Sequence, residues 1–263
     1  AVLFAGVAWV MVKHHTALYT QTMALGIVMF AIGTGWWALG RPMVRVVWWW
    51  VGYFVLTIAG ERLELGRLTG AAQRKGHIFR WALVLTMFGL MLAEAYPDLG
   101  VRVYALGMLG LGGWLLRYDI AWFTIHRPGL PRFAAWCLLT GYVWLIFGAL
   151  IVIVQGLQPG TFSYDAALHS VLLGFVFSMI FGHAPIIFPA LLGLPIEFHP
   201  GLYVALAMLH ISLIARVLGD VIGNADLRLW GGMFNAISML VYFGWMAVRR
   251  AYQELRRRLV ASG

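Results

Sequence analysis

Hydrophobic residues run along the chain in long blocks, and short polar or proline- and glycine-containing segments separate them. Most blocks reach the roughly 20 residues that an α-helix needs to cross a bilayer. They are too long for membrane β-strands and lack the alternation of such strands. The pattern predicts an all-α polytopic membrane helix bundle, with about nine transmembrane helices in a single domain over residues 1–263. The predicted helices are Ala1–Val12, Ala17–Leu39, Val44–Leu65, His77–Ala95, Leu99–Ile125, Phe133–Val154, Ser163–Ala184, Gly201–Ile222 and Leu227–Val248.

Three features qualify this prediction. The first block is short and the chain opens inside it, so we expect the first helix to be truncated. Pro185 and Pro189 follow the seventh block, and we expect them to end that helix, because proline lacks the backbone N–H. The last block continues into a basic tail, residues 249–263, which contains Arg249, Arg250 and three consecutive arginines at 256–258.

Composition and charge support a membrane location. Of the 263 residues, 62% are hydrophobic and 11% are charged, whereas soluble domains carry roughly 25% charged residues. The net charge of +9 lies in the connections and the tail, where Lys and Arg set orientation, so we expect no nucleic-acid partner. The charge bias predicts a cytoplasmic C-terminus. We also expect a bacterial inner-membrane location and contacts with the lipid bilayer and with other membrane or redox subunits. The single cysteine, Cys137, excludes an intrachain disulfide and a cysteine-based metal site.

Eight histidines are the main candidates for chemistry. Ionisable groups at membrane depth are costly, and imidazole is a common ligand of haem iron, copper and zinc. His169 lies about 9 Å inside the seventh predicted helix, and His210 lies near the middle of the eighth. Each is either a neutral imidazole bonded to a neighbouring helix or a haem or metal ligand, and we favour the ligand. His77 and His126 lie at predicted helix ends and are candidate partners of His183.

The seventh predicted helix places two histidines on one face. His169 and His183 are fourteen residues apart, which in an α-helix is about 40° of rotation and about 21 Å of rise. Such spacing lets one helix ligate two stacked haems. On another face, small residues recur at every fourth position, which predicts the close approach of a second helix. These residues are Ser170, Gly174, Ser178 and Gly182.

Charged residues inside the predicted helices each have two interpretations. Arg216 and Asp220 are four residues apart, so we expect a local ion pair, although Arg216 is also placed to bind a haem propionate. A further group either lines a proton or anion path or marks helix ends from which long side chains reach the membrane surface. We favour helix ends for this group, which comprises Glu61, Arg62, Glu64, Arg117 and Asp119.

The stretch from Asp165 to Pro185, with its leading His169, its glycines and the pair Gly182-His183, resembles the NnrS family. NnrS proteins are polytopic haem- and copper-associated membrane proteins linked to nitric oxide stress and distantly related to the catalytic subunit of haem–copper oxidases. The resemblance covers residues 165–222 and implies haem b, with copper as a further cofactor, and His169 as a ligand. A complete set of metal ligands has no match in this chain, and neither does the histidine–tyrosine pair of an oxidase copper centre.

The leading prediction is a haem-binding protein, in one version also copper-binding, that acts in electron transfer or in nitric oxide- or oxygen-related respiration. An enzyme activity would be that of an oxidoreductase subunit. Two alternatives stay open: a proton-coupled transporter or channel, and a cofactor-free anchoring subunit of a membrane complex. The candidate cofactor and metal residues are His169, His210, His183, Arg216, His77 and His126.

Overall fold

The protein is an all-helical bundle in the computed structural model, which describes residues 2–192 and 198–261. No strand occurs in these two ranges. The elements are α1 (Val2–His14), α2 (Leu18–Ala38), α3 (Met43–Leu65), the 3₁₀ turn η1 (Gly66–Thr69), α4 (Ala71–Leu92), α5 (Pro97–Tyr118), α6 (Ala121–Thr124), α7 (Leu130–Gln155), α8 (Phe162–His169), the π-helix η2 (Ser170–Phe177), α9 (Ser178–Leu192), α10 (Leu202–Ile222) and α11 (Ala225–Ala261).

Among the residues that the structure describes, seven helical runs are long and apolar enough to cross a membrane, so this is an integral membrane protein, but the prediction of about nine spans is not confirmed. The seven are α2, α3, α5 with α6, α7, α8 through α9, α10 and α11. Helix α1 has 13 residues, fewer than the roughly 20 that a span requires. Helix α4 has 22 residues, but Lys75, His77 and Arg80 lie in its first half and shorten its apolar part.

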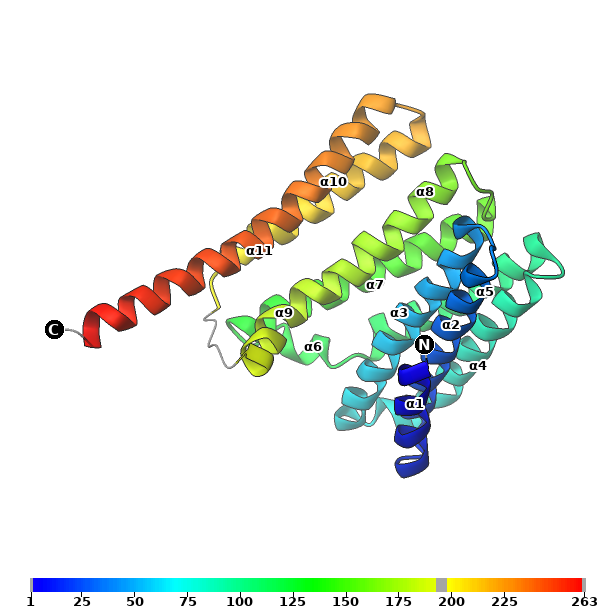
Figure 1. Ribbon diagram of the computed structural model, residues 1–263, viewed down its shortest axis with the longest axis horizontal. Helices are drawn as coiled ribbons and strands as arrows, with labels where there is room; N and C mark the ends of the chain where they lie inside the picture. Colours follow the sequence, from blue (N-terminus) through cyan, green and yellow to red (C-terminus); the bar gives the residue numbers. More distant parts are fainter. Residues whose placement is uncertain (1, 193–197, 262–263) are drawn as a thin grey trace.

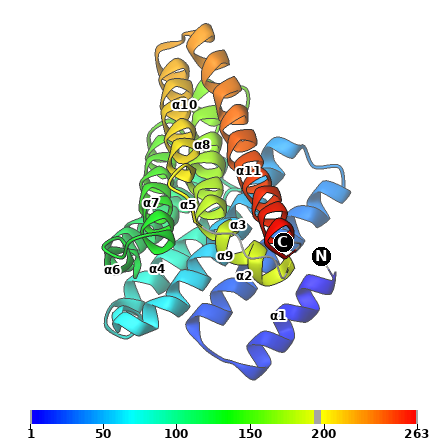
Figure 2. The same ribbon diagram turned by 90° about the vertical axis from the view of Figure 1, so that its left-hand side faces the viewer.

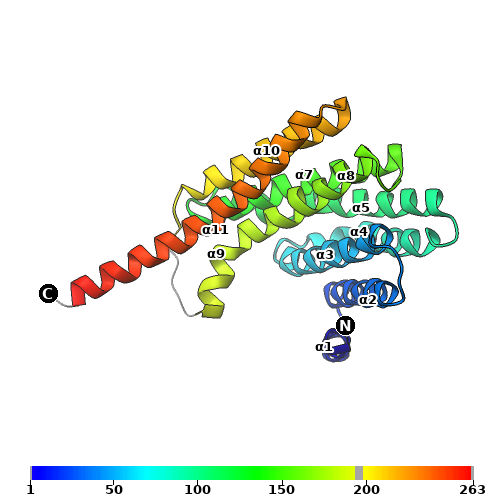
Figure 3. The ribbon, with the colours of Figure 1, turned by 45° about the horizontal axis from the view of Figure 1, so that its top comes forward.

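Neighbouring helices in the chain are neighbours in space. The pairs α2 with α3, α4 with α5 and α10 with α11 form antiparallel hairpins, and α7 joins α5 to the run α8–η2–α9. Figure 3 shows the resulting succession, from α1 and α2 at the bottom through α3, α4 and α5 to α7 and α8 and then α10 at the top. In Figures 1 and 2 the α10–α11 hairpin lies on one flank and α1 with α2 on the opposite flank. Helix α11 projects beyond the rest of the bundle (Figure 1).

Two large apolar cores and a small third one, around Leu213 and Val217, lie between the described helices. The larger core lies among α3, α5 and α7 and includes Trp48, Trp49 and Tyr104, all at most 3% exposed. The second joins α7, α9, α10 and α11, and in it the rings of Phe181 and Tyr242 stack in parallel, with centroids 3.8 Å apart. Aromatic side chains therefore stabilise the bundle by packing between its helices, in addition to those that lie on its outer surface.

The turn between α10 and α11 follows from its sequence. Gly223 ends α10 with a φ of 69°, a left-handed conformation that favours glycine. The Asn224 side chain then accepts a hydrogen bond from the backbone N–H of Leu227 and caps the start of α11. Asp220 and Arg228 are brought together across this turn, with their side-chain atoms 2.9 Å apart.

The seventh predicted helix is the least regular part of the fold. It consists of α8, the eight-residue π-helix η2 and α9. The prediction that it ends before Pro185 was wrong, because α9 continues through Pro185 and Pro189 to Leu192. Prolines are tolerated in membrane helices where neighbouring groups bond the freed carbonyls, and the end of α9 bends in Figure 3.

The prediction that a second helix packs closely against the small residues of this run is confirmed, and that helix is α7. The four small residues face α7: Ser170 lies against Gly148, Gly174 against Trp144, Ser178 against Gly141 and Gly182 against Cys137. A Cβ atom on Gly174 has no room beside the Trp144 indole. The small side chains thus set how closely α7 and the α8–α9 run can pack.

Candidate functional site

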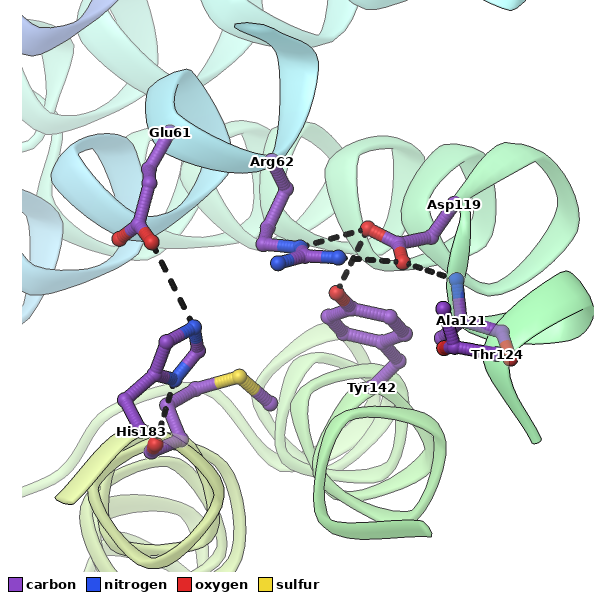
Figure 4. A network of polar contacts seen from close by, with 8 residues as sticks. Glu61, Arg62, Asp119, Ala121, Thr124, Tyr142 and His183 are labelled. Atoms are coloured by element: carbon purple, nitrogen blue, oxygen red, sulfur yellow. Dashed lines mark hydrogen bonds and ion pairs between the residues drawn. The ribbon is translucent and has the colours of Figure 1, made fainter. Parts of the chain in front are cut away.

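A buried ion pair joins α3 to the end of α5. The Arg62 guanidinium donates through Nε and Nη2 to the two carboxylate oxygens of Asp119, at 2.8 Å each. Arg62 and Asp119 are 4% and 2% exposed, so neither extends to the surface from a helix end. Both residues do lie at helix ends, but the expectation that their side chains reach the membrane surface was wrong. Figure 4 shows the pair lying between α3 and α7.

The Asp119 carboxylate is fully hydrogen-bonded. Besides Arg62, the backbone N–H of Ala121 donates to Oδ1 at 2.6 Å, and the Tyr142 hydroxyl donates to Oδ2 at 3.0 Å. Asp119 thereby caps the start of α6 and ties α5 to α7 (Figure 4). Four hydrogen bonds therefore fix the position of this carboxylate.

One residue before Arg62, Glu61 faces His183 of α9. Nε2 of His183 lies 3.4 Å from Oε1 of Glu61, and Nδ1 of the same ring lies 2.7 Å from the Met179 carbonyl oxygen. The Met179 carbonyl can only accept, so Nδ1 carries the hydrogen. In a neutral ring Nε2 then has only its lone pair, and the carboxylate opposite it is also an acceptor.

One shared proton resolves this conflict. With a proton on either Nε2 or Oε1, the contact becomes a hydrogen bond between an imidazolium and a carboxylate or between an imidazole and a carboxylic acid. The Glu61 side chain is 45% exposed and the His183 side chain 18% exposed, so the carboxyl group is the open side of the pair. The arrangement can hold one proton and exchange it through Glu61.

A second histidine–carboxylate pair lies near the other end of the same helical run. Nδ1 of His169 lies 2.8 Å from the Asp165 carbonyl oxygen and 3.4 Å from Oδ1 of the Asp165 carboxylate. The other carboxylate oxygen of Asp165 accepts from Arg216 at 2.9 Å and lies 3.4 Å from Arg228. The expected local pair of Arg216 with Asp220 was wrong, because Arg216 pairs with α8 while Asp220 pairs with Arg228.

His210 has a different partner from the other two histidines. The Trp144 indole N–H donates to Nδ1 of His210 at 3.0 Å, so the hydrogen of the neutral ring is on Nε2. Nε2 is buried and has no hydrogen-bond partner within the described part of the chain. A nitrogen that carries a hydrogen has no lone pair for a metal, so His210 in this state is a donor rather than a ligand.

The other histidines proposed as ligands, His77 and His126, do not contact His169, His183 or His210 in a shared site. His77 and His126 are exposed, and His183 has Glu61 opposite it, so the prediction that one of the two is its partner was wrong. His169 and His210 also have separate partners, Asp165 and Trp144. Over residues 2–192 and 198–261, no three His, Cys, Asp or Glu side chains gather in a group that would hold a metal ion.

Comparison with known proteins gives a family without a stated activity. A family model described as a domain of unknown function, DUF8744, matches residues 1–251. The chain belongs to the DUF8744 family. No match was found among curated proteins or among solved structures. The resemblance of this DUF8744 protein to NnrS proteins stays a prediction.

Several site residues of this DUF8744 protein were not identified from the sequence. Tyr142 and Trp144 lie within an unbroken apolar block and resemble packing aromatics there. Glu61 was considered, but nothing in its neighbourhood points to His183, which is 122 residues later in the chain. The available signal was the occurrence of Arg62 and Asp119 as opposite charges within apolar surroundings, since buried charges require partners.

Proposed function

We propose that this protein moves protons across the membrane, as a proton-coupled transporter or channel. The observation that carries the proposal is the contact of His183 Nε2 with Glu61 Oε1 while Nδ1 is committed to a backbone carbonyl. This geometry leaves one proton to be shared between two groups that both exchange protons near neutral pH in suitable surroundings. Histidine and carboxylate chains within membrane helices are the usual elements of proton relays.

The position of the two pairs supports a path rather than a single site. His169 and His183 are separated by fourteen residues of one helical run, about 21 Å at the α-helical rise and less through the π segment. The hydrocarbon core of a bilayer is about 30 Å thick. The two histidine–carboxylate pairs therefore span most of the distance that a proton has to cross.

Polar atoms lie between the pairs. The hydroxyl of Ser178 and Nε2 of His210 are buried and have no hydrogen-bond partner among the described residues. Ser178 lies on the run between His169 and His183, and the Trp144 indole that holds His210 packs on Gly174 of the same run. Buried polar atoms of this kind bind internal water, and chains of water carry protons between titratable groups.

The fixed charges beside Glu61 have a positioning role in this proposal. The Arg62–Asp119 pair anchors the end of α3 to α5 and, through Tyr142, to α7. Glu61 precedes Arg62 in α3, so the anchor holds the Glu61 side chain toward α9. Both oxygens of Asp119 are already engaged by hydrogen-bond donors, so we assign Asp119 a structural role and not a place on the proton path.

Proton flux into liposomes tests the proposal. Purified protein is reconstituted with a pH-sensitive dye inside the vesicles, and a potassium diffusion potential drives proton entry. We expect the interior of vesicles that contain the wild type to acidify faster than the interior of protein-free vesicles. The rate of proton entry should fall at least about tenfold in Glu61→Gln and in His183→Gln, a scale typical of removing a proton-transfer group. Glu94→Gln is the matched control, because Glu94 forms an exposed ion pair with Arg41 away from both histidines. Wild-type flux equal to that of empty vesicles, or unchanged flux in both variants, would refute proton movement by this pair.

A haem- or copper-binding redox protein is the second candidate. His169 supports it, because metal-binding histidines usually donate their other N–H to a carbonyl or carboxylate, as His169 Nδ1 does toward Asp165. His183 and His210 do not supply a second free lone pair in this arrangement, since one faces Glu61 and the other carries hydrogen on Nε2. The residues therefore fit a single histidine ligand and not an axial pair.

A reduced-minus-oxidised absorption spectrum separates the candidates. A redox protein shows haem bands that disappear in His169→Ala, and a colourless preparation without extractable haem or copper removes this candidate. The anchoring-subunit alternative predicts neither a haem spectrum nor proton flux. The three outcomes therefore do not overlap.

A further inference from the structure

A basic cavity lies at the end of the bundle where α2 begins and α3 ends. It has a volume of about 430 Å³ and lies between the first turn of α2, the last turns of α3, η1 and the first half of α4. Arg67, His77 and Arg80 contribute its cationic and polar wall, and Leu18 and Leu63 contribute its apolar wall. The cavity is separate from the Glu61–His183 pair, neither member of which lines it.

None of the described residues that line this cavity is acidic, so its positive charge has no carboxylate partner among them. The sequence contains no acidic residue between Glu64 and Glu94, although four Lys and Arg residues lie in that stretch. Within the described part of the chain, no ion pair engages Arg67 or Arg80; the Arg67 guanidinium lies over the Tyr19 ring, 5.7 Å from its centroid. Elsewhere, Arg62, Arg216 and Arg228 all have carboxylate partners.

The local backbone holds the cavity open. Gly70, with a φ of 70°, reverses the chain between η1 and α4. Helix α4 is kinked at Lys75, whose φ of −128° is not helical, and the Trp114 indole N–H of α5 donates to the Lys75 carbonyl at 3.2 Å. This bond fixes the kink by satisfying a carbonyl that the distorted turn exposes. Arg67 before the turn and Arg80 after it are thus presented to the same space.

We infer that this cavity binds the phosphate headgroup of an anionic phospholipid. Leu18 is the first residue of α2 and Leu63 lies two residues from the end of α3, so the cavity is at the ends of two membrane-crossing helices. This is the depth of the headgroups. Guanidinium groups bind phosphate oxygens through paired hydrogen bonds, and basic pockets between membrane helices are typical headgroup sites. The apolar wall formed by Leu18 and Leu63 suits the first carbons of the lipid chains.

The test measures stabilisation of the purified full chain by defined lipids. Thermal unfolding in mild detergent is followed by reaction of the buried Cys137 with a thiol-reactive fluorophore, because Cys137 is the single cysteine and is fully buried. Phosphatidylglycerol, phosphatidylcholine and inorganic phosphate are added separately. We expect phosphatidylglycerol to raise the midpoint temperature of the wild type and the other two to leave it unchanged. In Arg67→Gln and Arg80→Gln the rise should fall to less than about half, since a ligand stabilises only in proportion to its binding.

Arg127→Gln is the matched control. It removes one positive charge from an exposed connection and does not line the cavity. A rise that is kept in Arg127→Gln and lost in the cavity variants supports the inference. Equal loss in all three variants would show a diffuse attraction to charge, an equal rise with phosphatidylcholine would show a general lipid effect, and a rise with inorganic phosphate would show a soluble anion site. Each of these three results overturns the lipid assignment, and none depends on the proposed proton path.

Discussion

The Arg62–Asp119 pair allows a quantitative test of the packing of α3 against α5 and α7. Arg62→Met removes one partner and leaves the Asp119 carboxylate buried with only Ala121 and Tyr142 as donors. Removal of one member of a buried ion pair costs about 3–5 kcal/mol of unfolding free energy. Asp119→Leu leaves the buried guanidinium without a partner and also frees the Tyr142 hydroxyl and the Ala121 N–H. We therefore expect a loss of about 5 kcal/mol or more.

The double variant Arg62→Met/Asp119→Leu should be less damaging than the sum of the two changes. Both charges are removed together, so the remaining cost comes from the Tyr142 hydroxyl and the Ala121 N–H. Each unsatisfied group costs about 1–3 kcal/mol, so we expect a coupling energy of at least about 2 kcal/mol between the two substitutions. The exposed pair Arg41–Glu94, at 3.2 Å, is the control, for which we expect at most about 1 kcal/mol of coupling.

Unfolding by denaturing detergent in mixed micelles, reported by Cys137 labelling, measures all of these free energies. Cys137 is fully buried in the core that joins α7 to α9, so its reaction follows the loss of this packing. If the single substitutions at Arg62 and Asp119 lower the unfolding free energy no more than single substitutions at Arg41 and Glu94 do, Arg62 and Asp119 are not a buried pair. If the double variant costs the full sum of the single variants, the two side chains do not interact.

Two further changes probe the packing around α7. Gly174→Ala places a methyl group against the Trp144 indole and should destabilise the protein by about 1–3 kcal/mol, whereas Gly113→Ala, with open space around its Cβ position, should be neutral or slightly stabilising in the same labelling assay. Equal effects of these two alanines would contradict the close approach at Gly174. Tyr142→Phe removes one donor to the Asp119 carboxylate and should cost about 1.5–3 kcal/mol, and an unchanged unfolding curve would show that this hydrogen bond is absent.

The sequence predicted the helices well because long apolar blocks are a local signal. The predicted helices Val44–Leu65 and Gly201–Ile222 correspond to α3 (Met43–Leu65) and α10 (Leu202–Ile222). The number of membrane-crossing runs was harder to predict, because α4 is helical on both sides of its kink at Lys75 although its first half is basic. Helix formation and membrane crossing depend on different properties of a segment.

The site was predicted only in part, because it depends on partners far apart in the chain. His169 and His183 were identified from their depth, but their carboxylate partners required the fold, and Glu61 comes from another helix. Arg216 shows the limit most clearly. The acid four residues away was the natural choice by helical spacing, yet Arg216 reaches Asp165, which lies 51 residues earlier in the chain. Helical periodicity describes neighbours within one helix and does not specify contacts between helices.

The π-helix η2 lets the chain between the two histidine pairs change in length without changing their orientation. Each α-helical residue turns the chain by about 100°, and a π turn accommodates a residue more than an α turn does. Deleting one residue from Ser170–Phe177 would let the segment become α-helical, and α9 would keep its orientation relative to α8, because the π segment absorbs the extra residue. His183 would then still face Glu61, and His169 would keep Asp165. Within the DUF8744 family, a chain with one residue fewer between these two histidines is therefore expected to have an ordinary α-helix here and to keep the contact between α9 and α3.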